Sequence, residues 1–205
     1  MTEKKTFVER YQEKDTPWEL NRPDHNLIDF FTSFPVPVVG SAIDIGCGTG
    51  NNTIWLASHG FQVTGCDLSD IALAQAEAKA ESAKVTCAFF CGDIMRDQPP
   101  GAPFVFAFDR GCFHTFDALV DRSRIAARVA ELLSDGGRWL SLVGSKDEDR
   151  GDRPGPPQLS AGEVLSAIEP YFELISMRRG HFDANQASGG ALNWICHFRK
   201  RALQN

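Results

Sequence analysis

Long apolar runs and dense basic clusters are both absent from this sequence of 205 residues. No run approaches the roughly 18 apolar residues that a membrane-spanning helix needs. Lys and Arg total 21 against 27 Asp and Glu, a formal net charge of -6, so no basic stripe for nucleic acid is apparent. The densest basic groups, Arg178-Arg179 and residues 199–201, are both short. We therefore expect a cytoplasmic protein that binds neither nucleic acid nor a membrane.

The C-x-x-C spacing typical of metal and redox sites is also absent. Most of the cysteines lie in apolar stretches that resemble strands, where Cys behaves as a small hydrophobic residue. We expect reduced, buried thiols and no metal site. The six residues concerned are Cys47, Cys66, Cys87, Cys91, Cys112 and Cys196.

The length and composition fit one globular domain spanning residues 1–205. Hydrophobic residues make up 42% of the chain and charged residues 23%, which is ordinary for a folded protein. A chain of this length forms one sizeable α/β domain and is short for two. We divide it into an N-terminal arm (1–34), a core (40–145), a charged loop (146–157) and a C-terminal region (158–205).

The stretch Ser41–Asn52 is the most informative part of the chain. Ile43 and Ile45 are β-branched and flanked by small residues, which favours a buried strand. The glycines that follow allow positive φ angles and close approach of the backbone to a ligand. The helix predicted over residues 51–59 would direct its free N–H groups at that ligand. The alternative is a glycine-rich loop without a ligand. The glycines are Gly46, Gly48 and Gly50.

Acidic residues recur at the ends of the strands predicted after this turn. In an open parallel sheet, ligands bind outside the carboxyl ends of the strands, so these acids are expected at one edge. The first lies about 20 residues beyond the glycines, the spacing at which a carboxylate binds ribose hydroxyls. An exposed loop residue is the alternative. The predicted strands and the acids at their ends are 61–67 with Asp67, 85–91 with Asp93, and 104–108 with Asp109.

Alternating strand and helix patterns continue to residue 143 and predict a Rossmann-like α/β fold. We expect a doubly wound, mostly parallel seven-stranded sheet with helices on both faces. Two late strands, 172–178 and 192–198, should form an antiparallel pair at its edge. Residues 146–157 have almost no apolar content, so they should form a mobile loop or, because they follow a strand, a lid.

The glycine motif separates two cofactor classes. A nicotinamide fingerprint, G-x-G-x-x-G, would need glycine where Asn51 stands. The stretch Ala42–Gly50 instead closely resembles the first motif of class I S-adenosylmethionine-dependent methyltransferases. Cys66–Ser69, Gly92–Ile94 and Phe108–Gly111 are similar to the motifs that follow it in this family.

The resemblance implies S-adenosylmethionine as the cofactor and a role for each matched residue. The three glycines would lie against the methionine and ribose, and acids at the rim suit a cationic sulfonium. The other implied roles are ribose binding by Asp67 beside Leu68, adenine binding by Asp93 and Ile94, lining of the entrance by Asp109, and orientation of the glycine turn by Asp44.

The segment Thr16–Pro23 carries a narrower likeness. It is similar to the Thr-Pro-Trp-(Asp/Glu)-x-x-Arg-Pro segment of the thiopurine, thiol and halide methyltransferases and of related tellurite-resistance methyltransferases. This likeness implies that Trp18 covers the cofactor and that a small, soft nucleophile is methylated. That branch commonly has glycine where Asn21 stands. A Trp that only anchors the arm to the core is the alternative.

The candidates for the acceptor side follow the fourth predicted strand or lie in the arm. His114 is our candidate general base, with a polar residue beside a helix as the alternative. Arg22, Arg110 and Phe113 are candidates for binding the small-molecule acceptor. The competing functions are a nicotinamide-dependent oxidoreductase and a scaffold protein that binds the cofactor without catalysis.

Overall fold

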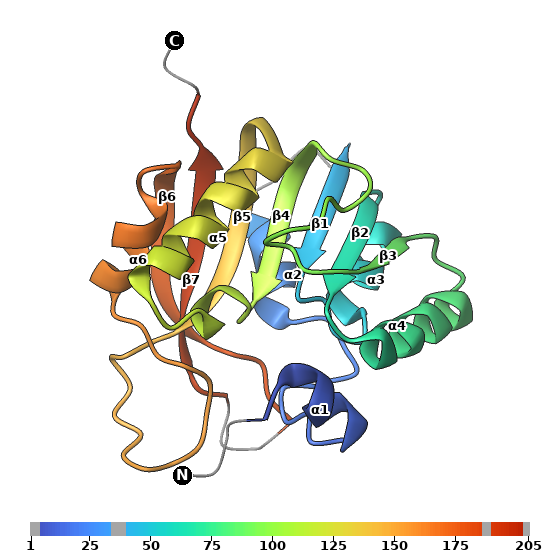
Figure 1. Ribbon diagram of the computed structural model, residues 1–205, viewed down its shortest axis with the longest axis horizontal. Helices are drawn as coiled ribbons and strands as arrows, with labels where there is room; N and C mark the ends of the chain where they lie inside the picture. The colour runs from blue at the N-terminus through green and yellow to red at the C-terminus, as the bar shows by residue number, and fades with distance from the viewer. Residues whose placement is uncertain (1–4, 34–39, 186–189, 203–205) are drawn as a thin grey trace.

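The computed structural model describes residues 5–33, 40–185 and 190–202, and its centre is one seven-stranded sheet (Figure 1). The strand order is β3-β2-β1-β4-β5-β7-β6. β7 runs antiparallel to both of its neighbours, and the other pairs are parallel. The predicted fold class, including the antiparallel pair at the edge, is confirmed. The strands are β1 (Ser41–Ile45), β2 (Gln62–Asp67), β3 (Ala88–Cys91), β4 (Phe104–Arg110), β5 (Leu133–Gly144), β6 (Phe172–His181) and β7 (Leu192–Lys200).

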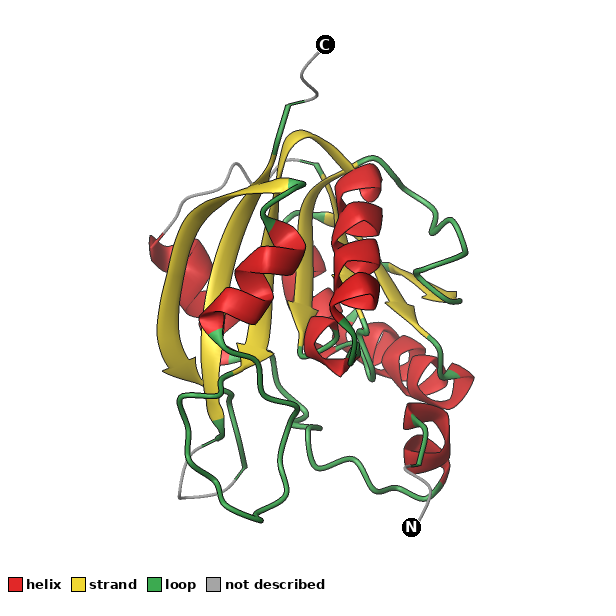
Figure 2. Cartoon of the chain, turned by 60° about the vertical axis from the view of Figure 1, so that its left-hand side comes forward, coloured by secondary structure: helices red, strands yellow, loops and turns green. Residues whose placement is uncertain are grey.

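Helices cover both faces of the sheet (Figure 2). Residues of α2 (His25–Ser33) and α3 (Asn51–Ser58) share one apolar core, and those of α5 (Leu119–Leu132) and α6 (Ala161–Ile168) share the other. Strand residues alternate between the two: Leu140 and Leu142 of β5 join the first core, and Trp139 and Val143 the second. The remaining helices are α1 (Phe7–Gln12), α4 (Asp70–Ala83) and the 3-10 turn η1 (Phe113–Thr115).

The fifth strand begins earlier than its sequence predicts. The turn residues at 134–137 predict a break between a helix over 117–133 and a strand over 138–143, but Leu133 is already extended and pairs with Phe104. Gly136 has a φ of 69°, and the register shifts between Phe104 and Phe106, so the strand bends there and continues. The sequence also predicts that residues 34–37 stop the helix before them and that the link between the two late strands ends at residues 188–190; residues 34–37, 188 and 189 lie outside the described residues.

The loop at residues 146–157 carries internal hydrogen bonds. The Arg150 Nη2 donates to the Pro156 carbonyl oxygen at 2.6 Å. The Gln158 amide donates to the carbonyl oxygens of Ser145 and Glu148, at 2.8 and 3.0 Å. These contacts give the loop a defined path after β5; its mobility and its possible role as a lid stay predictions.

The six cysteines are free thiols. Cys47, Cys66 and Cys196 are buried as expected, but Cys87 and Cys112 are only partly buried and Cys91, at the end of an outer strand, is exposed. Within the described ranges, no group of His, Cys, Asp or Glu is arranged to hold a metal ion. No helix in the same ranges combines the length and the apolar character needed to span a membrane.

Candidate active site

The glycine turn joins β1 to α3 at the carboxyl edge of the sheet. Gly48 and Gly50 have φ angles of 54° and 78°, a region that residues with a Cβ rarely adopt. A Cβ on Gly48 would lie 2.5 Å from the Tyr11 hydroxyl oxygen, and one on Gly50 would lie 2.7 Å from the Cβ of Ala76. Gly46 also has a positive φ, of 67°. The backbone angle therefore favours glycine at all three positions, and at Gly50 close packing against Ala76 requires it as well.

Asp44 lies inside the fold behind this turn. Its buried carboxylate accepts a hydrogen bond from the Thr53 hydroxyl at 2.7 Å, which ties β1 to α3. Burial raises the pKa of Asp44 to about 7. This position fits the expected role of orienting the glycine turn.

Asp67, at the end of β2, faces the same turn. One carboxylate oxygen accepts from the Gly48 N–H at 2.8 Å and the other from the Ser69 N–H at 2.9 Å. Burial raises the pKa of this carboxyl, and the backbone N–H groups oppose that effect. The next side chain, Leu68, is 58% exposed. The acid and the glycines therefore come together as their spacing predicts.

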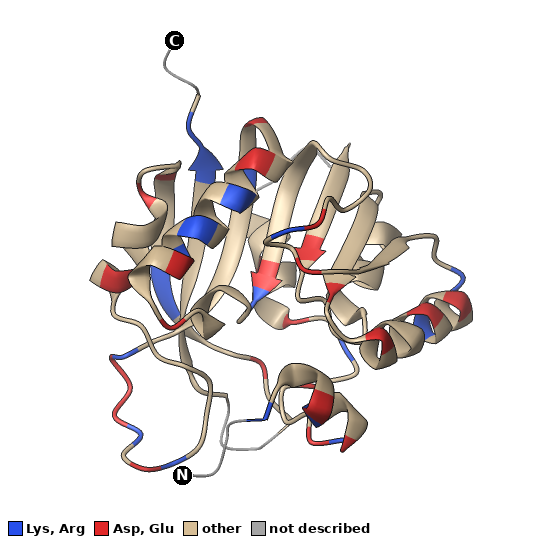
Figure 3. Cartoon of the chain, viewed as in Figure 1, with Lys and Arg blue, Asp and Glu red and all other residues tan. Residues whose placement is uncertain are grey.

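Asp93 and Ile94 follow β3 and point in different directions. Asp93 is partly exposed, and one of its oxygens accepts from the Met95 N–H at 2.9 Å. Ile94 is buried in the core formed with α5. The structure therefore leaves Asp93 at the rim, whereas the Ile94 side chain is turned away from a ligand at the edge. Figure 3 shows acidic residues gathered at this end of the central strands.

Asp109 lies behind the rim, contrary to the expectation that it lines the entrance. Its side chain is 1% exposed. One oxygen accepts from the N–H groups of Cys112 and Phe113, both at 3.0 Å, and the other accepts from the Trp139 indole at 2.9 Å. Burial raises the pKa of this carboxyl. Asp109 thus holds the turn after β4 in place.

His114 and Phe113 face inward as well. His114 is 5% exposed, and its Nδ1 accepts a hydrogen bond from the Gly144 N–H at 2.8 Å. A neutral ring that accepts at Nδ1 carries its proton on Nε2, so neither nitrogen offers a free lone pair. Phe113 is buried against Trp139. This geometry argues against His114 as the base and against Phe113 as a substrate contact.

Arg110 and Arg22 join the arm to the sheet edge. Arg110 Nε donates to buried Asp24 at 2.5 Å, and its terminal nitrogens donate to the carbonyl oxygens of Trp18 and Asp183 at 3.2 and 2.8 Å. Arg22 pairs with the Asp183 carboxylate at 2.7 Å. Both cations line the hollow described next, and most of their N–H groups donate to other residues of the protein.

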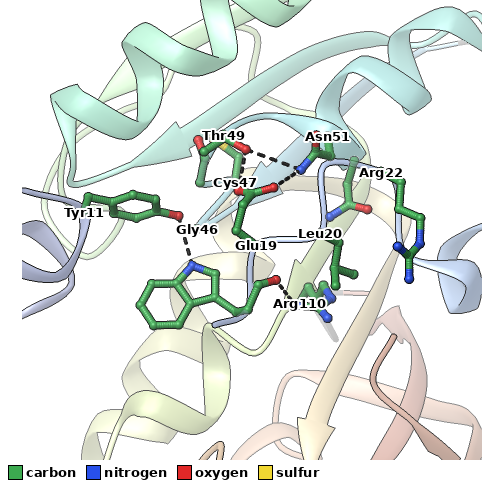
Figure 4. Close-up of a pocket in the computed structure, with 12 residues that line it drawn as sticks. Tyr11, Glu19, Leu20, Arg22, Gly46, Cys47, Thr49, Asn51 and Arg110 are labelled. Atoms are coloured by element: carbon green, nitrogen blue, oxygen red, sulfur yellow. Dashed lines mark hydrogen bonds between the residues drawn. The ribbon is translucent and has the colours of Figure 1, made fainter. Parts of the chain in front are cut away.

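A hollow lies between the arm and the glycine turn (Figure 4). The hollow contains about 430 Å³ of space free of protein atoms, a volume that includes the solvent-filled space at its open side. Trp18 lies over it, and its indole N–H donates to the Tyr11 hydroxyl at 3.1 Å. The lining residues are Tyr11, Trp18, Glu19, Leu20, Arg22, Gly46, Cys47, Gly48, Thr49, Asn51, Asn52 and Arg110.

The hollow also contains a polar cluster that the sequence did not predict. The Glu19 carboxylate accepts from the Thr49 hydroxyl at 2.5 Å and from the Asn51 amide at 2.6 Å, as Figure 4 shows. Lys79 Nζ, from α4, lies 3.5 Å from the same carboxylate. Tyr11, whose hydroxyl is bonded to the Trp18 indole, covers the hollow together with Trp18. The only signal was the position of Glu19 inside the Thr16–Pro23 segment, where a loop carboxylate normally indicates a solvated residue.

Comparisons with known proteins agree on the family. A family model described as a methyltransferase domain matches residues 42–137. Probable thiol methyltransferase 2 of Arabidopsis thaliana is 31% identical over 165 residues, covering 79% of this chain and 71% of that protein.

Solved structures show the same fold. One, on the conversion of a disulfide bond into a thioacetal group during echinomycin biosynthesis, has a TM-score of 0.76 at 22% identity and covers 92% of this chain and 87% of its own. The Burkholderia thailandensis 1,6-didemethyltoxoflavin-N1-methyltransferase, with bound 1,6-didemethyltoxoflavin and S-adenosylhomocysteine, has a TM-score of 0.73 at 20% identity and covers 96% and 86%. This chain is therefore an enzyme of the class I S-adenosylmethionine-dependent methyltransferases, with S-adenosylmethionine as its cofactor.

Proposed function

We propose that the enzyme methylates a small-molecule thiol or another soft nucleophile. The observation that carries this proposal is the likeness to the thiol methyltransferase, which extends over most of both chains. An oxidoreductase lacks comparable support, since the fingerprint glycine is replaced by Asn51.

The residues at the sheet edge fit the cofactor. The two crowded glycines keep side chains away from the turn, so that a ligand can lie on the backbone. Asp67 is fixed by two N–H groups and keeps further lone pairs for ribose hydroxyls. We assign Asp93 and Leu68 to the adenine side of the site. Bound here, S-adenosylmethionine supplies a methyl group that is already activated for displacement by its sulfonium.

The protein must then position the acceptor against the methyl group and exclude water from the site. Orientation in a closed site contributes about 7 to 11 kcal/mol to lowering the barrier of such a reaction. Trp18 and Tyr11 cover one side of the hollow. His114 offers no free lone pair for taking a proton. We therefore propose that the acceptor reacts as a thiolate formed in solution.

An acceptor panel tests the proposed function. Wild-type enzyme is incubated with methyl-labelled cofactor and with thiols, selenols, halides, and arsenic or tellurium oxyanions. Matched alcohols and amines serve as controls. We expect transfer to the soft nucleophiles well above transfer to the controls. Preferential methylation of oxygen or nitrogen would overturn the acceptor class, and no transfer to any member would favour a non-catalytic scaffold.

The rate with a thiol should follow the ionisation of the thiol itself. Below its pKa of about 8.5, the rate should rise about tenfold for each pH unit and level off above it. Initial rates with two thiols of different pKa, measured below saturation, test this dependence. The midpoint should move with the thiol, and iodide, which carries its charge at every pH, should give a flat profile. A midpoint common to both thiols would indicate a base on the enzyme.

Replacing Asp67 should weaken cofactor binding. We expect Asp67→Ala to cost about 1 to 3 kcal/mol of binding free energy for S-adenosylhomocysteine, because hydrogen bonds involving a charged group are lost. Calorimetric titration measures the change. Asp70→Ala is the matched control, since Asp70 is an exposed acid three residues further along, at the start of α4. Equal affinities of the two variants would remove Asp67 from the site.

A further inference from the structure

The hollow beside the glycine turn lies at one end of the sheet-edge site. Its lining includes Arg110 from the end of β4 and residues of the turn after β1, but none from β2 or β3. Asp67 is the last residue of β2 and Asp93 follows β3, and both strands lie on the other side of β1. With the adenosine on the Asp67 side, as proposed above, the amino-acid end of the cofactor would lie in the hollow.

The charged side chains that line the hollow match the amino-acid end of the cofactor. Its lining contains one carboxylate, Glu19, and two guanidinium groups, Arg22 and Arg110. The methionine portion of the cofactor carries an α-ammonium and an α-carboxylate, so it offers one group for each sign. An ammonium needs an anionic acceptor when it leaves water, and among the lining residues only Glu19 supplies one.

The neighbours of Glu19 keep its carboxylate charged and leave one of its oxygens able to accept a further hydrogen bond. Burial alone would raise its pKa, but hydrogen bonds from Thr49 and from the Asn21 N–H, together with the positive charge of Lys79, lower the pKa below its usual value. The carboxylate is therefore charged at neutral pH. Asn21 and Asn51 both donate to Oε1, whereas Thr49, through its hydroxyl, is the one donor to Oε2 among the described residues. A carboxylate oxygen accepts about two hydrogen bonds, so Oε2 has room for another donor.

We propose that Glu19 binds the α-ammonium of the cofactor through its Oε2 atom. The inference rests on the proposed placement of the cofactor and adds a recognition residue from the arm. The arm segment that carries Trp18 thus has two functions: the Trp18 indole covers the hollow, and Glu19 binds the positively charged ammonium group of the ligand. Lys79 and the two hydrogen-bonded side chains hold the carboxylate in position.

The test compares ligands that differ at the amino-acid end. S-adenosylhomocysteine carries the ammonium but no sulfonium charge. A deaminated analogue lacks only the ammonium, and 5′-methylthioadenosine lacks the whole amino-acid end. Affinities are measured by calorimetry for wild type, for Glu19→Gln, and for the control Glu13→Gln, which removes an exposed arm carboxylate paired with Lys5.

We expect Glu19→Gln to bind S-adenosylhomocysteine about 10- to 150-fold more weakly than wild type does. It should bind the deaminated analogue and 5′-methylthioadenosine with nearly unchanged affinity, and Glu13→Gln should behave as wild type. Wild type alone should also prefer S-adenosylhomocysteine to its deaminated analogue, a comparison that holds even if the variant folds poorly.

Three results would overturn the inference. Equal weakening of all three ligands would show that Glu19 only clamps the arm. Weakened binding of S-adenosylmethionine with unchanged binding of S-adenosylhomocysteine would assign Glu19 to the sulfonium. No preference of wild type for the ammonium-bearing ligand would also reject it. Failure of wild type to bind S-adenosylhomocysteine at all would instead overturn the proposed function, and the inference with it.

Discussion

Asp24→Ala should destabilise the protein by about 3 to 5 kcal/mol, the cost of leaving a buried charge without its partner. Asp24 is 0% exposed and accepts from Arg110 at 2.5 Å. It also accepts from the N–H and the side-chain amide of Asn26, at 2.9 and 2.8 Å, and so caps the start of α2. The substitution would remove the helix cap and leave the Arg110 guanidinium without its carboxylate partner. Urea unfolding of the variant and wild type measures the loss.

Two further variants identify the cause. Asp183→Ala removes an acid that pairs with the more exposed Arg22, so its ion pair should contribute only about 0.2 to 1 kcal/mol. Adding Arg110→Met to Asp24→Ala removes the stranded charge and should restore part of the stability. If the double variant were no more stable than Asp24→Ala, the stranded charge would not be the cause.

Gly50→Ala should cost about 2 to 5 kcal/mol of stability. The left-handed backbone accounts for about 1 to 2 kcal/mol, and overpacking for about 1 to 3 kcal/mol. The added Cβ would lie 2.7 Å from the Cβ of Ala76 and 3.0 Å from the ring of Phe89. These contacts join α3, α4 and β3 behind the turn, so they leave little room for adjustment. Urea unfolding and calorimetric binding of S-adenosylhomocysteine should both show the loss.

Gly136→Ala is the matched control for backbone strain. Gly136 has a similar φ, 69°, but a Cβ there would meet nothing within 4 Å. Its cost should therefore be confined to the backbone, about 1 to 2 kcal/mol. Equal destabilisation by the two substitutions would show that close packing does not determine the need for glycine at position 50.

The sequence was sufficient for the strands, the glycine turn and the position of Asp67 beside that turn, because these depend on local patterns. Apolar periodicity places the strands, and chain connectivity brings their carboxyl ends to one edge. A residue just after a strand has a known position but an unknown direction. Asp109 and His114 turn inward because partners 30 residues away, Trp139 and Gly144, bind their side chains. No local pattern encodes such pairs.

Glu19 could not be identified for a related reason. Its partners Thr49 and Asn51 lie 30 and 32 residues further along the chain and meet it only when the arm folds over the turn. Arg110 shows the same limit, since its main partner, Asp24, is 86 residues away. The likeness of the Thr16–Pro23 segment to a known branch indicated a functional arm but not which side chains act.

The antiparallel direction of β7 has a practical consequence for handling the protein. Its last residues pair with Arg138 in the first half of β5 and with Phe172 at the start of β6, so the strand leaves the sheet at the end opposite the glycine turn. Helix α1 lies at the edge that carries the turn (Figure 1). A purification tag or surface linker attached after Lys200 therefore departs from the far side of the molecule. The same attachment before Phe7 would begin beside the cover of the ligand hollow.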